Sequence, residues 1–140
     1  MQKIIARNKQ EMSDFAKSQA NSSSPNQIIG LKGTLGSGKS FFAKEFINEI
    51  QDEKTEILSP TFNLVYSYDT KKGEVFHFDL YRLKTAQELE NIGFFDALKN
   101  GICLIEWPQI AQNFLTKLPN YTEIEIEIKK EDESRIIKII

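Results

Sequence analysis

The stretch that decides the fold is Gly33-Thr34-Leu35-Gly36-Ser37-Gly38-Lys39-Ser40, which matches the pattern G-x-x-x-x-G-K-[ST] at every defined position. With this composition, chance would supply such a match only about 0.005 times per sequence. A short β-branched run, Gln27–Lys32, predicts a buried strand before the motif, and apolar residues repeating every four positions over Lys39–Gln51 predict a helix after it. A glycine-rich turn that precedes a lysine and a serine by accident is the alternative interpretation.

The residue types of this loop are those that bind the phosphates of a nucleotide. Glycines let the backbone curl so that successive N–H groups point at a phosphate. The helix that begins near Lys39 adds the positive end of its dipole. We expect the Lys39 ammonium to reach the β- and γ-phosphates and the Ser40 hydroxyl to ligate Mg²⁺.

Two acidic residues follow apolar runs that predict strands: Asp79 ends Val75–Asp79, and Glu106 ends Ile102–Glu106. P-loop proteins hold Mg²⁺ with an acid at the end of a neighbouring strand, and ligands of open α/β sheets bind beyond the carboxyl ends of the strands. We expect Glu106 on the metal side and Asp79 as the acid that orients water or the metal, although either could instead cap a turn. Thr61 lies in a loop about twenty residues after the motif, where a nucleotide switch can hold a threonine, but spacing alone favours an ordinary turn residue.

The rest of the chain alternates further strand and helix patterns. Strands are expected at Met1–Ala6, Glu56–Leu58, Leu64–Asp69 and Glu74–Asp79, and helices at Lys9–Ala20, Thr85–Asn91 and Phe94–Lys99. Tyr121–Ile128 and Arg135–Ile140 alternate apolar and polar residues, which predicts a terminal hairpin with one solvated face. No repeat or domain boundary interrupts the pattern, so residues 1–140 are expected to form one domain.

Composition excludes several classes of protein. The apolar share of 40% is too high for a disordered chain, and no apolar run approaches the ~20 residues of a membrane helix. A net charge of −2 argues against a sequence-independent nucleic-acid binder, which would carry a basic excess. With one cysteine, Cys103, and no secretory signal, we expect a cytoplasmic protein without a membrane association.

Four other features of the sequence are not assigned a function from the residues alone. His77, the single histidine, lies within a strand pattern and is expected to be structural, and Cys103 is expected in the core. Trp107 follows Glu106 and either covers the site or packs. Asn8–Glu11 echoes a guanine-reading motif, but it precedes the phosphate loop and ends in Glu, so we interpret it as a coincidence.

Four motifs together resemble the TsaE (YjeE-like) family, small bacterial P-loop ATPases needed for the threonylcarbamoyladenosine modification of tRNA. They are Gly33–Ser40, Ser59–Val65, His77–Leu83 and Ile105–Pro108, in the order and spacing of the family. The resemblance extends from the first expected helix to the terminal hairpin. It implies an α/β P-loop NTPase fold of three layers, with a mostly parallel mixed sheet and added antiparallel hairpins.

The resemblance also implies ATP and Mg²⁺ as ligands. The residues that would contact the nucleotide are Gly33, Leu35, Gly36, Ser37, Gly38, Lys39, Ser40, Trp107 and Arg135. Ser40 and Glu106 would hold Mg²⁺, while Lys39, Thr61, Asp79 and Glu106 would serve hydrolysis. The implied role is that of an accessory ATPase of the threonylcarbamoyl-transferase protein pair. The absence of a basic excess suggests that tRNA is contacted mainly through those partners.

The chain departs from the family pattern at four positions. The family usually has an acid at Thr34, alanine at Ser37, threonine at Ser40 and often threonine at Met12. The first two positions act through their backbone, and Ser40 supplies the same hydroxyl as threonine. Met12 leaves the adenine contact of residues 7–12 undefined.

Two other functions compete with the ATPase. A small-molecule kinase would clamp the transferred phosphoryl group with Arg or Lys, but the chain has three scattered arginines and no Arg-rich lid. A non-catalytic adaptor would use bound ATP to order the Ser59–Asn63 loop for docking. The shortness of the chain, which leaves little room for a second substrate pocket, favours the ATPase.

Overall fold

A computed structural model describes all of residues 1–140, and its framework is one seven-stranded sheet of order β1-β7-β6-β2-β5-β4-β3. The strands are β1 (Gln2–Ala6), β2 (Ile28–Lys32), β3 (Val65–Thr70), β4 (Gly73–Asp79), β5 (Ile102–Glu106), β6 (Tyr121–Ile128) and β7 (Arg135–Ile139). β6, β2, β5 and β4 are parallel neighbours, and β1 runs in the same direction because it and β6 are both antiparallel to β7. β3 and β7 run the opposite way. The mostly parallel mixed sheet is therefore confirmed.

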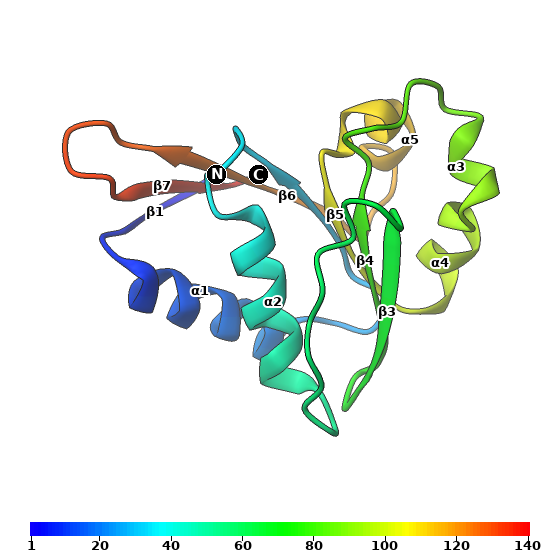
Figure 1. The fold of residues 1–140 in the computed structure, drawn as a ribbon, viewed down its shortest axis with the longest axis horizontal. Helices are drawn as coiled ribbons and strands as arrows, with labels where there is room; N and C mark the ends of the chain where they lie inside the picture. The colour runs from blue at the N-terminus through cyan, green and yellow to red at the C-terminus, as the bar shows by residue number, and fades with distance from the viewer.

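Helices cover both faces of this sheet (Figure 1). One face carries α1 (Lys9–Ser22) and α2 (Lys39–Ile50), and the other carries α3 (Glu88–Asn91), α4 (Phe94–Asn100), the 3₁₀ turn η1 (Pro108–Ala111) and α5 (Gln112–Leu115). Successive strand residues alternate between the two cores, so Leu104 packs in the first and Ile105 in the second. The expected three-layer α/β fold is confirmed, with β3–β4 and β6–β7 as its added hairpins.

Aromatic packing holds α2 in place. The ring of Phe42 lies 5.7 Å from that of Phe15 on α1 and 6.0 Å from that of Phe46, one turn further along α2. Phe42 and Phe46 are fully buried, and each such ring contributes about 1.5–3 kcal/mol to stability. The start of α2, and with it the loop that precedes the helix, is thereby fixed against the sheet. None of the helices is long and apolar enough to cross a membrane.

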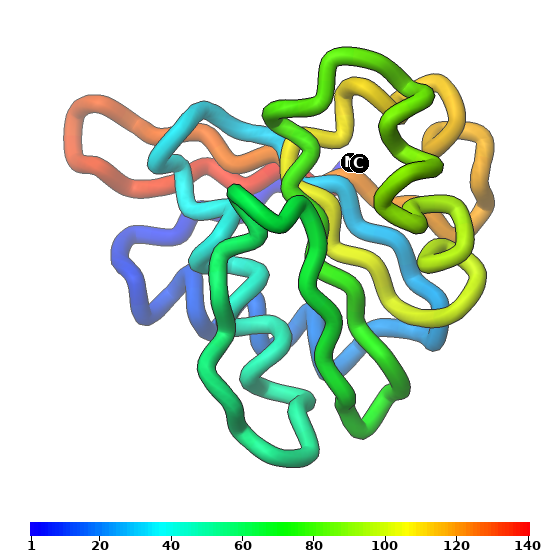
Figure 2. The backbone as a smooth tube through the Cα atoms, turned by 45° about the vertical axis from the view of Figure 1, so that its right-hand side comes forward, coloured from blue at the N-terminus to red at the C-terminus, as the bar shows by residue number.

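The strand expected at Glu56–Leu58 is absent, and that prediction is wrong. Residues 52–64 form a long connection, which Figure 2 shows running back along α2 toward the end where that helix begins. Leu58 N–H donates to the Tyr68 hydroxyl at 3.1 Å rather than to a strand backbone, so no ladder forms. The connection is anchored instead by Ile57, which is buried.

Two other expectations need correction. The helix expected at Thr85–Asn91 is shorter, because Thr85 lies in the turn before α3, where its N–H and hydroxyl both donate to the Glu88 carboxylate. The last hairpin was expected to have one solvated face, and that expectation is wrong at Glu123, which is only 8% exposed. There β6 passes beneath α5, and Glu123 accepts hydrogen bonds from Gln112 and Tyr121 and pairs with Lys32 Nζ at 3.1 Å.

Candidate active site

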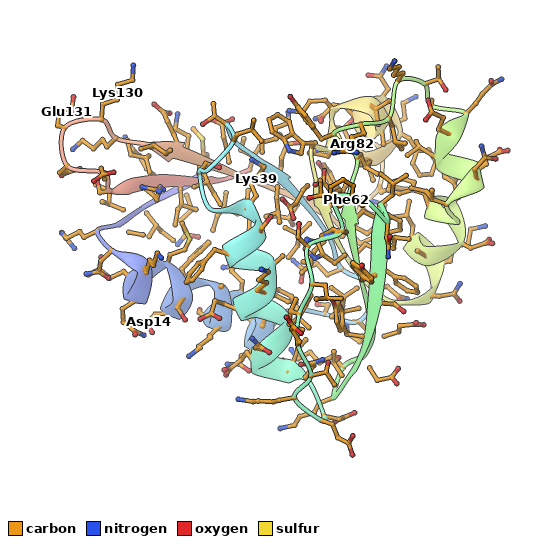
Figure 3. The ribbon with its side chains drawn as sticks, in the orientation of Figure 1. Asp14, Lys39, Phe62, Arg82, Lys130 and Glu131 are labelled. Atoms are coloured by element: carbon orange, nitrogen blue, oxygen red, sulfur yellow. The ribbon has the colours of Figure 1, made fainter.

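The loop 33–38 joins the carboxyl end of β2 to the first turn of α2, where Figure 3 labels Lys39. Two of its glycines are required by the geometry. Gly38 has φ +119°, a conformation that other residues rarely adopt, and a Cβ at Gly33 would lie 2.5 Å from both the Ile126 carbonyl oxygen and Ser37 Oγ. The first N–H groups of α2 have no partner within the helix, so the loop and the helix together offer a set of donors to an anion.

The Lys39 side chain is held at the floor of this loop and is only 5% exposed. Its Nζ donates to the carbonyl oxygens of Gly33 at 2.8 Å and Thr34 at 2.9 Å and lies 4.4 Å from the centre of the Trp107 ring. Burial lowers the pKa of Lys39, while the carboxylates of Glu106 and Asp79 oppose that shift. The ammonium is therefore held against the carbonyl groups of the loop and is shielded from solvent.

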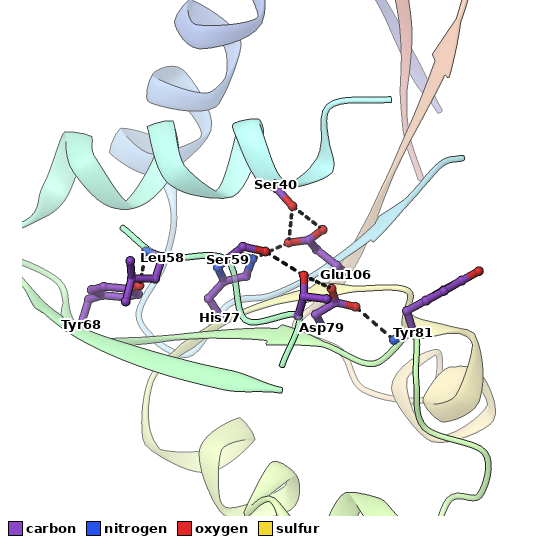
Figure 4. A network of polar contacts seen from close by, with 9 residues as sticks. Ser40, Leu58, Ser59, Tyr68, His77, Asp79, Tyr81 and Glu106 are labelled. Atoms are coloured by element: carbon purple, nitrogen blue, oxygen red, sulfur yellow. Dashed lines mark hydrogen bonds and ion pairs between the residues drawn. The ribbon is translucent and has the colours of Figure 1, made fainter. Parts of the chain in front are cut away.

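Ser40, Glu106 and His77 form a chain of hydrogen bonds that joins α2, β5 and β4 (Figure 4). Ser40 Oγ donates to Glu106 at 2.9 Å from Oε1 and 3.1 Å from Oε2. His77 Nε2 lies 2.6 Å from Glu106 Oε2. The glutamate is 3% exposed and the histidine 0%, so this carboxylate is held on both sides in a nearly dry environment.

Asp79 lies beside Glu106, because β4 and β5 are parallel and pair these two residues in register. Its Oδ1 accepts the Tyr81 N–H at 3.0 Å, and its Oδ2 accepts the Thr61 hydroxyl at 3.4 Å. Burial raises the pKa of Asp79, and the nearby Glu106 carboxylate adds to that effect, while the Tyr81 N–H opposes it. Two acids from adjacent strands thus meet beside Lys39, with Thr61 arriving from the long connection after α2.

Two neighbouring cavities open along the loop. The smaller, about 300 Å³, is lined by Lys39, Ser40, Asp79, Glu106 and Trp107 among others. The larger, about 530 Å³, lies between the loop, the start of α1 and the turn before β7. Gly36, Gly38 and Phe41 line both cavities, so the two form adjoining compartments on either side of the loop.

Arg135 lines the larger cavity and binds the loop itself. Its Nε donates to the Ser37 carbonyl oxygen at 2.8 Å, and its Nη2 donates to that of Gly36 at 3.4 Å. A third donor, Nη1, bonds the Glu133 carbonyl oxygen. These contacts hold the Gly36 and Ser37 carbonyl groups against the guanidinium and so support the loop from the side of β7.

The family model described as threonylcarbamoyl adenosine biosynthesis protein TsaE matches residues 6–137. This chain belongs to the TsaE family. It is 42% identical to the tRNA threonylcarbamoyladenosine biosynthesis protein TsaE of Rickettsia felis, over 98% of this chain and 78% of the relative. The corresponding protein of Rickettsia prowazekii is 41% identical over 86% of this chain and 82% of its own length.

A solved structure agrees with this membership. The crystal structure of YdiB from Bacillus subtilis superposes with a TM-score of 0.74 at 28% identity, covering 99% of this chain and 83% of that one. The TsaE-family chain therefore shares its overall fold with YdiB, and the similarity covers nearly the whole of this chain.

Most residues that the sequence singled out in this TsaE-family chain lie around the smaller cavity. They are Leu35, Gly36, Gly38, Lys39, Ser40, Thr61, Asp79, Glu106 and Trp107. Ser37 and Arg135 line the larger cavity, and Gly33 contacts Lys39 through its carbonyl group. Met12 also lines the larger cavity, together with Asn8, whose side chain accepts the Glu11 N–H as the N-cap of α1.

Trp107 covers the site in addition to packing. Its ring contacts that of Tyr81, with 4.7 Å between centres, and lies over the Lys39 ammonium. Its backbone has φ +58°, which costs a residue with a side chain about 1–2 kcal/mol. Trp107 keeps this unfavourable conformation directly after Glu106, the last residue of β5, so the strained backbone lies at the site.

His77 makes a contact that the sequence analysis did not predict. It was expected to be structural, and in the fold its Nε2 lies 2.6 Å from Glu106 Oε2. The signal was present in the strand pattern, because residues two apart in a strand share a face, so His77 lies on the same face as Asp79. Recognising the contact also required the β4–β5 register, which a strand pattern alone does not supply.

The donors around the smaller cavity are hard oxygens of the kind that Mg²⁺ prefers: two carboxylates, from Asp79 and Glu106, and two hydroxyls, from Ser40 and Thr61. No three His, Cys, Asp or Glu side chains gather anywhere into a group that could hold a metal alone. Mg²⁺ in proteins is commonly bound by one or two carboxylates together with substrate phosphates. The residues therefore fit a Mg²⁺ ion that arrives with a nucleotide.

Replacing Ser37 with alanine is expected to raise the free energy of unfolding by about 1 kcal/mol, because the buried Ser37 hydroxyl has no hydrogen-bond partner. Thermal unfolding measures the change, with Ser67→Ala, an exposed serine on β3, as the matched control expected within about 0.5 kcal/mol of wild type. A clear loss of stability in Ser37→Ala would contradict this expectation.

Proposed function

We propose that this chain binds ATP with Mg²⁺ at the loop 33–40 and hydrolyses it to ADP and phosphate in support of tRNA threonylcarbamoyladenosine biosynthesis. The observation that carries the proposal is the convergence of Lys39, Ser40, Asp79 and Glu106 on one cavity beside that loop. The pathway follows from the relatives named as tRNA threonylcarbamoyladenosine biosynthesis proteins.

The two adjoining cavities suit the two ends of a nucleotide. The smaller cavity, which holds the charged side chains, would take the β- and γ-phosphates. The larger one, with Met12 and Phe41 in its wall, offers apolar surface for a base. In this pose the backbone N–H groups of Gly36–Ser40 would bind the phosphates, and Arg135 would hold the loop in the conformation that exposes them.

The chemical step is an attack of water on the γ-phosphorus, which breaks the bond to the bridging oxygen of the β-phosphate. Asp79 would orient the water and accept its proton, and the Lys39 ammonium would offset charge on the equatorial oxygens. Thr61 shares a hydrogen bond with Asp79, which would couple the long connection after α2 to the bound nucleotide. Ser40 and Glu106 would hold Mg²⁺, which offsets phosphate charge when bound.

The positions of the arginines argue against a kinase. Arg135 is engaged with backbone carbonyl groups, Arg82 lies 4.6 Å from the centre of the Phe62 ring, and Arg7 pairs with Glu11 at 3.6 Å. None of the three lines the smaller cavity, so no arginine is available to clamp a phosphoryl group in transfer.

The rim of the site offers a surface for the proposed transferase pair. Leu35 is 70% exposed, Phe62 80% and Tyr81 56%, and each lies on a segment that reaches the smaller cavity. Exposed apolar and aromatic side chains gathered at one edge of a cleft are typical of a protein-binding surface. With a net charge of −2, we expect tRNA to be reached through those partners rather than bound directly.

Phosphate release from ATP, measured with and without the purified transferase pair, tests the proposed function. We expect slow hydrolysis by the chain alone and a faster rate with the pair present, and Phe62→Ala is expected to reduce the stimulation while leaving the basal rate within about twofold, because a rim residue contributes mainly to docking. Absence of hydrolysis and of association would contradict the proposal. Transfer of labelled γ-phosphate to an acceptor other than water would instead favour a kinase.

A further inference from the structure

His77 is a fully buried polar residue whose surroundings do not explain it as packing. It is 0% exposed, and the register of β4 places it between Tyr66 of β3 and Leu104 of β5. Its Nδ1 is buried without a hydrogen-bond partner, which costs about 1–3 kcal/mol. An apolar side chain would fill this place without that cost, so the imidazole has another reason to be there.

The one polar contact of His77 goes to Glu106. Because a carboxylate accepts hydrogen bonds and does not donate them, Nε2 carries the hydrogen of the 2.6 Å contact with Oε2. The Ser40 hydroxyl approaches the same carboxylate from α2 and lies closer to Oε1. The carboxylate therefore has one oxygen fixed by β4 and the other facing the start of α2.

Carboxylates that bind metals are oriented by such outer partners, and losing one commonly weakens metal binding 10- to 100-fold. Without the His77 donor, the Glu106 side chain could rotate away from Ser40, since no other donor reaches Oε2 from the sheet. The imidazole does not line the smaller cavity, so it would act through Glu106 rather than touch the nucleotide.

We propose that His77 is a positioning residue: its Nε2–H fixes the Glu106 carboxylate so that Glu106 and Ser40 Oγ are presented together to Mg²⁺. This inference rests on the proposed function, because it assigns a role within the same site. The same role explains why a buried His77–Glu106 pair is present, although a contribution to stability alone does not explain it.

The test compares His77→Leu, which removes the donor, with His77→Gln, whose amide nitrogen can occupy the place of Nε2. Tyr66→Phe, beside His77 on β3, controls for loss of a polar group from the same face of the sheet. Mg²⁺ is titrated into each variant saturated with a non-hydrolysable ATP analogue. The affinity for the same analogue is measured in EDTA, and thermal unfolding verifies that each variant is folded.

We expect the Mg²⁺ concentration for half-saturation to rise by about 10- to 100-fold in His77→Leu and to stay within about threefold of wild type in His77→Gln and Tyr66→Phe. The affinity in EDTA should be unchanged in all three. An unchanged Mg²⁺ midpoint in His77→Leu, or an equal loss of affinity with and without Mg²⁺, would overturn the inference in favour of a structural role. A wild-type chain that fails to bind the analogue would instead overturn the proposed function.

Discussion

Lys39→Ala is expected to lower the turnover of ATP by about 10²- to 10³-fold or more, the effect of removing one charged donor from a developing negative charge. Lys39 is the one lysine that lines the smaller cavity, and its ammonium is held against the carbonyl groups of Gly33 and Thr34. Its removal would therefore leave the phosphates without a lysine within reach. Phosphate release under saturating ATP and Mg²⁺ is the measurement.

Lys44→Ala is the matched control for this prediction. Lys44 lies on the same helix, is partly exposed and makes no hydrogen bond or ion pair, so its removal should leave turnover within about twofold. Thermal unfolding of both variants separates loss of function from loss of fold. Equal turnover by Lys39→Ala and wild type would show that hydrolysis does not occur at this loop.

Asp79→Asn is expected to lower turnover by about 10²-fold or more, because the amide cannot accept a proton from the attacking water. Nucleotide affinity should change much less. The shape of the side chain is kept, and the amide oxygen can still accept the Tyr81 N–H. A variant that retains full turnover would remove Asp79 from the chemical step.

The same variant is expected to be more stable than wild type near neutral pH. Burial raises the pKa of Asp79 in the folded chain, so the ionised carboxylate destabilises the fold above that pKa. The penalty disappears as the pH falls below the ordinary value of about 3.9, where the group is protonated in both states. Thermal unfolding of the two chains should therefore converge as the pH is lowered, and hydrolysis by wild type should fall as Asp79 becomes protonated.

The sequence predicts well the parts of the site that depend on local pattern. The loop 33–40 is defined by its own residues and by the strand and helix beside it. Asp79 and Glu106 could be expected near each other because each ends a strand of a parallel sheet, and the carboxyl ends of such strands meet at one edge. Their pairing in register confirms this expectation.

Contacts that depend on the register of the sheet could not be predicted in the same way. The His77–Glu106 contact joins residues 29 apart, and the Arg135–Ser37 contact joins residues 98 apart. The second arises because β7 joins β6, and β6 lies beside β2, an order that no local pattern encodes. The burial of Glu123 was missed for a related reason, because β6 lies beside β2 and this neighbour brings Lys32 Nζ to 3.1 Å from the Glu123 carboxylate.

A structure of the chain with Mg²⁺ and a non-hydrolysable ATP analogue is the most direct test of the proposed function. The phosphates should lie on the N–H groups of Gly36–Ser40 with Lys39 Nζ turned toward them, and the metal should contact Ser40 Oγ on the side of Glu106. An analogue bound elsewhere, or a metal held away from both Ser40 and Glu106, would contradict the proposal.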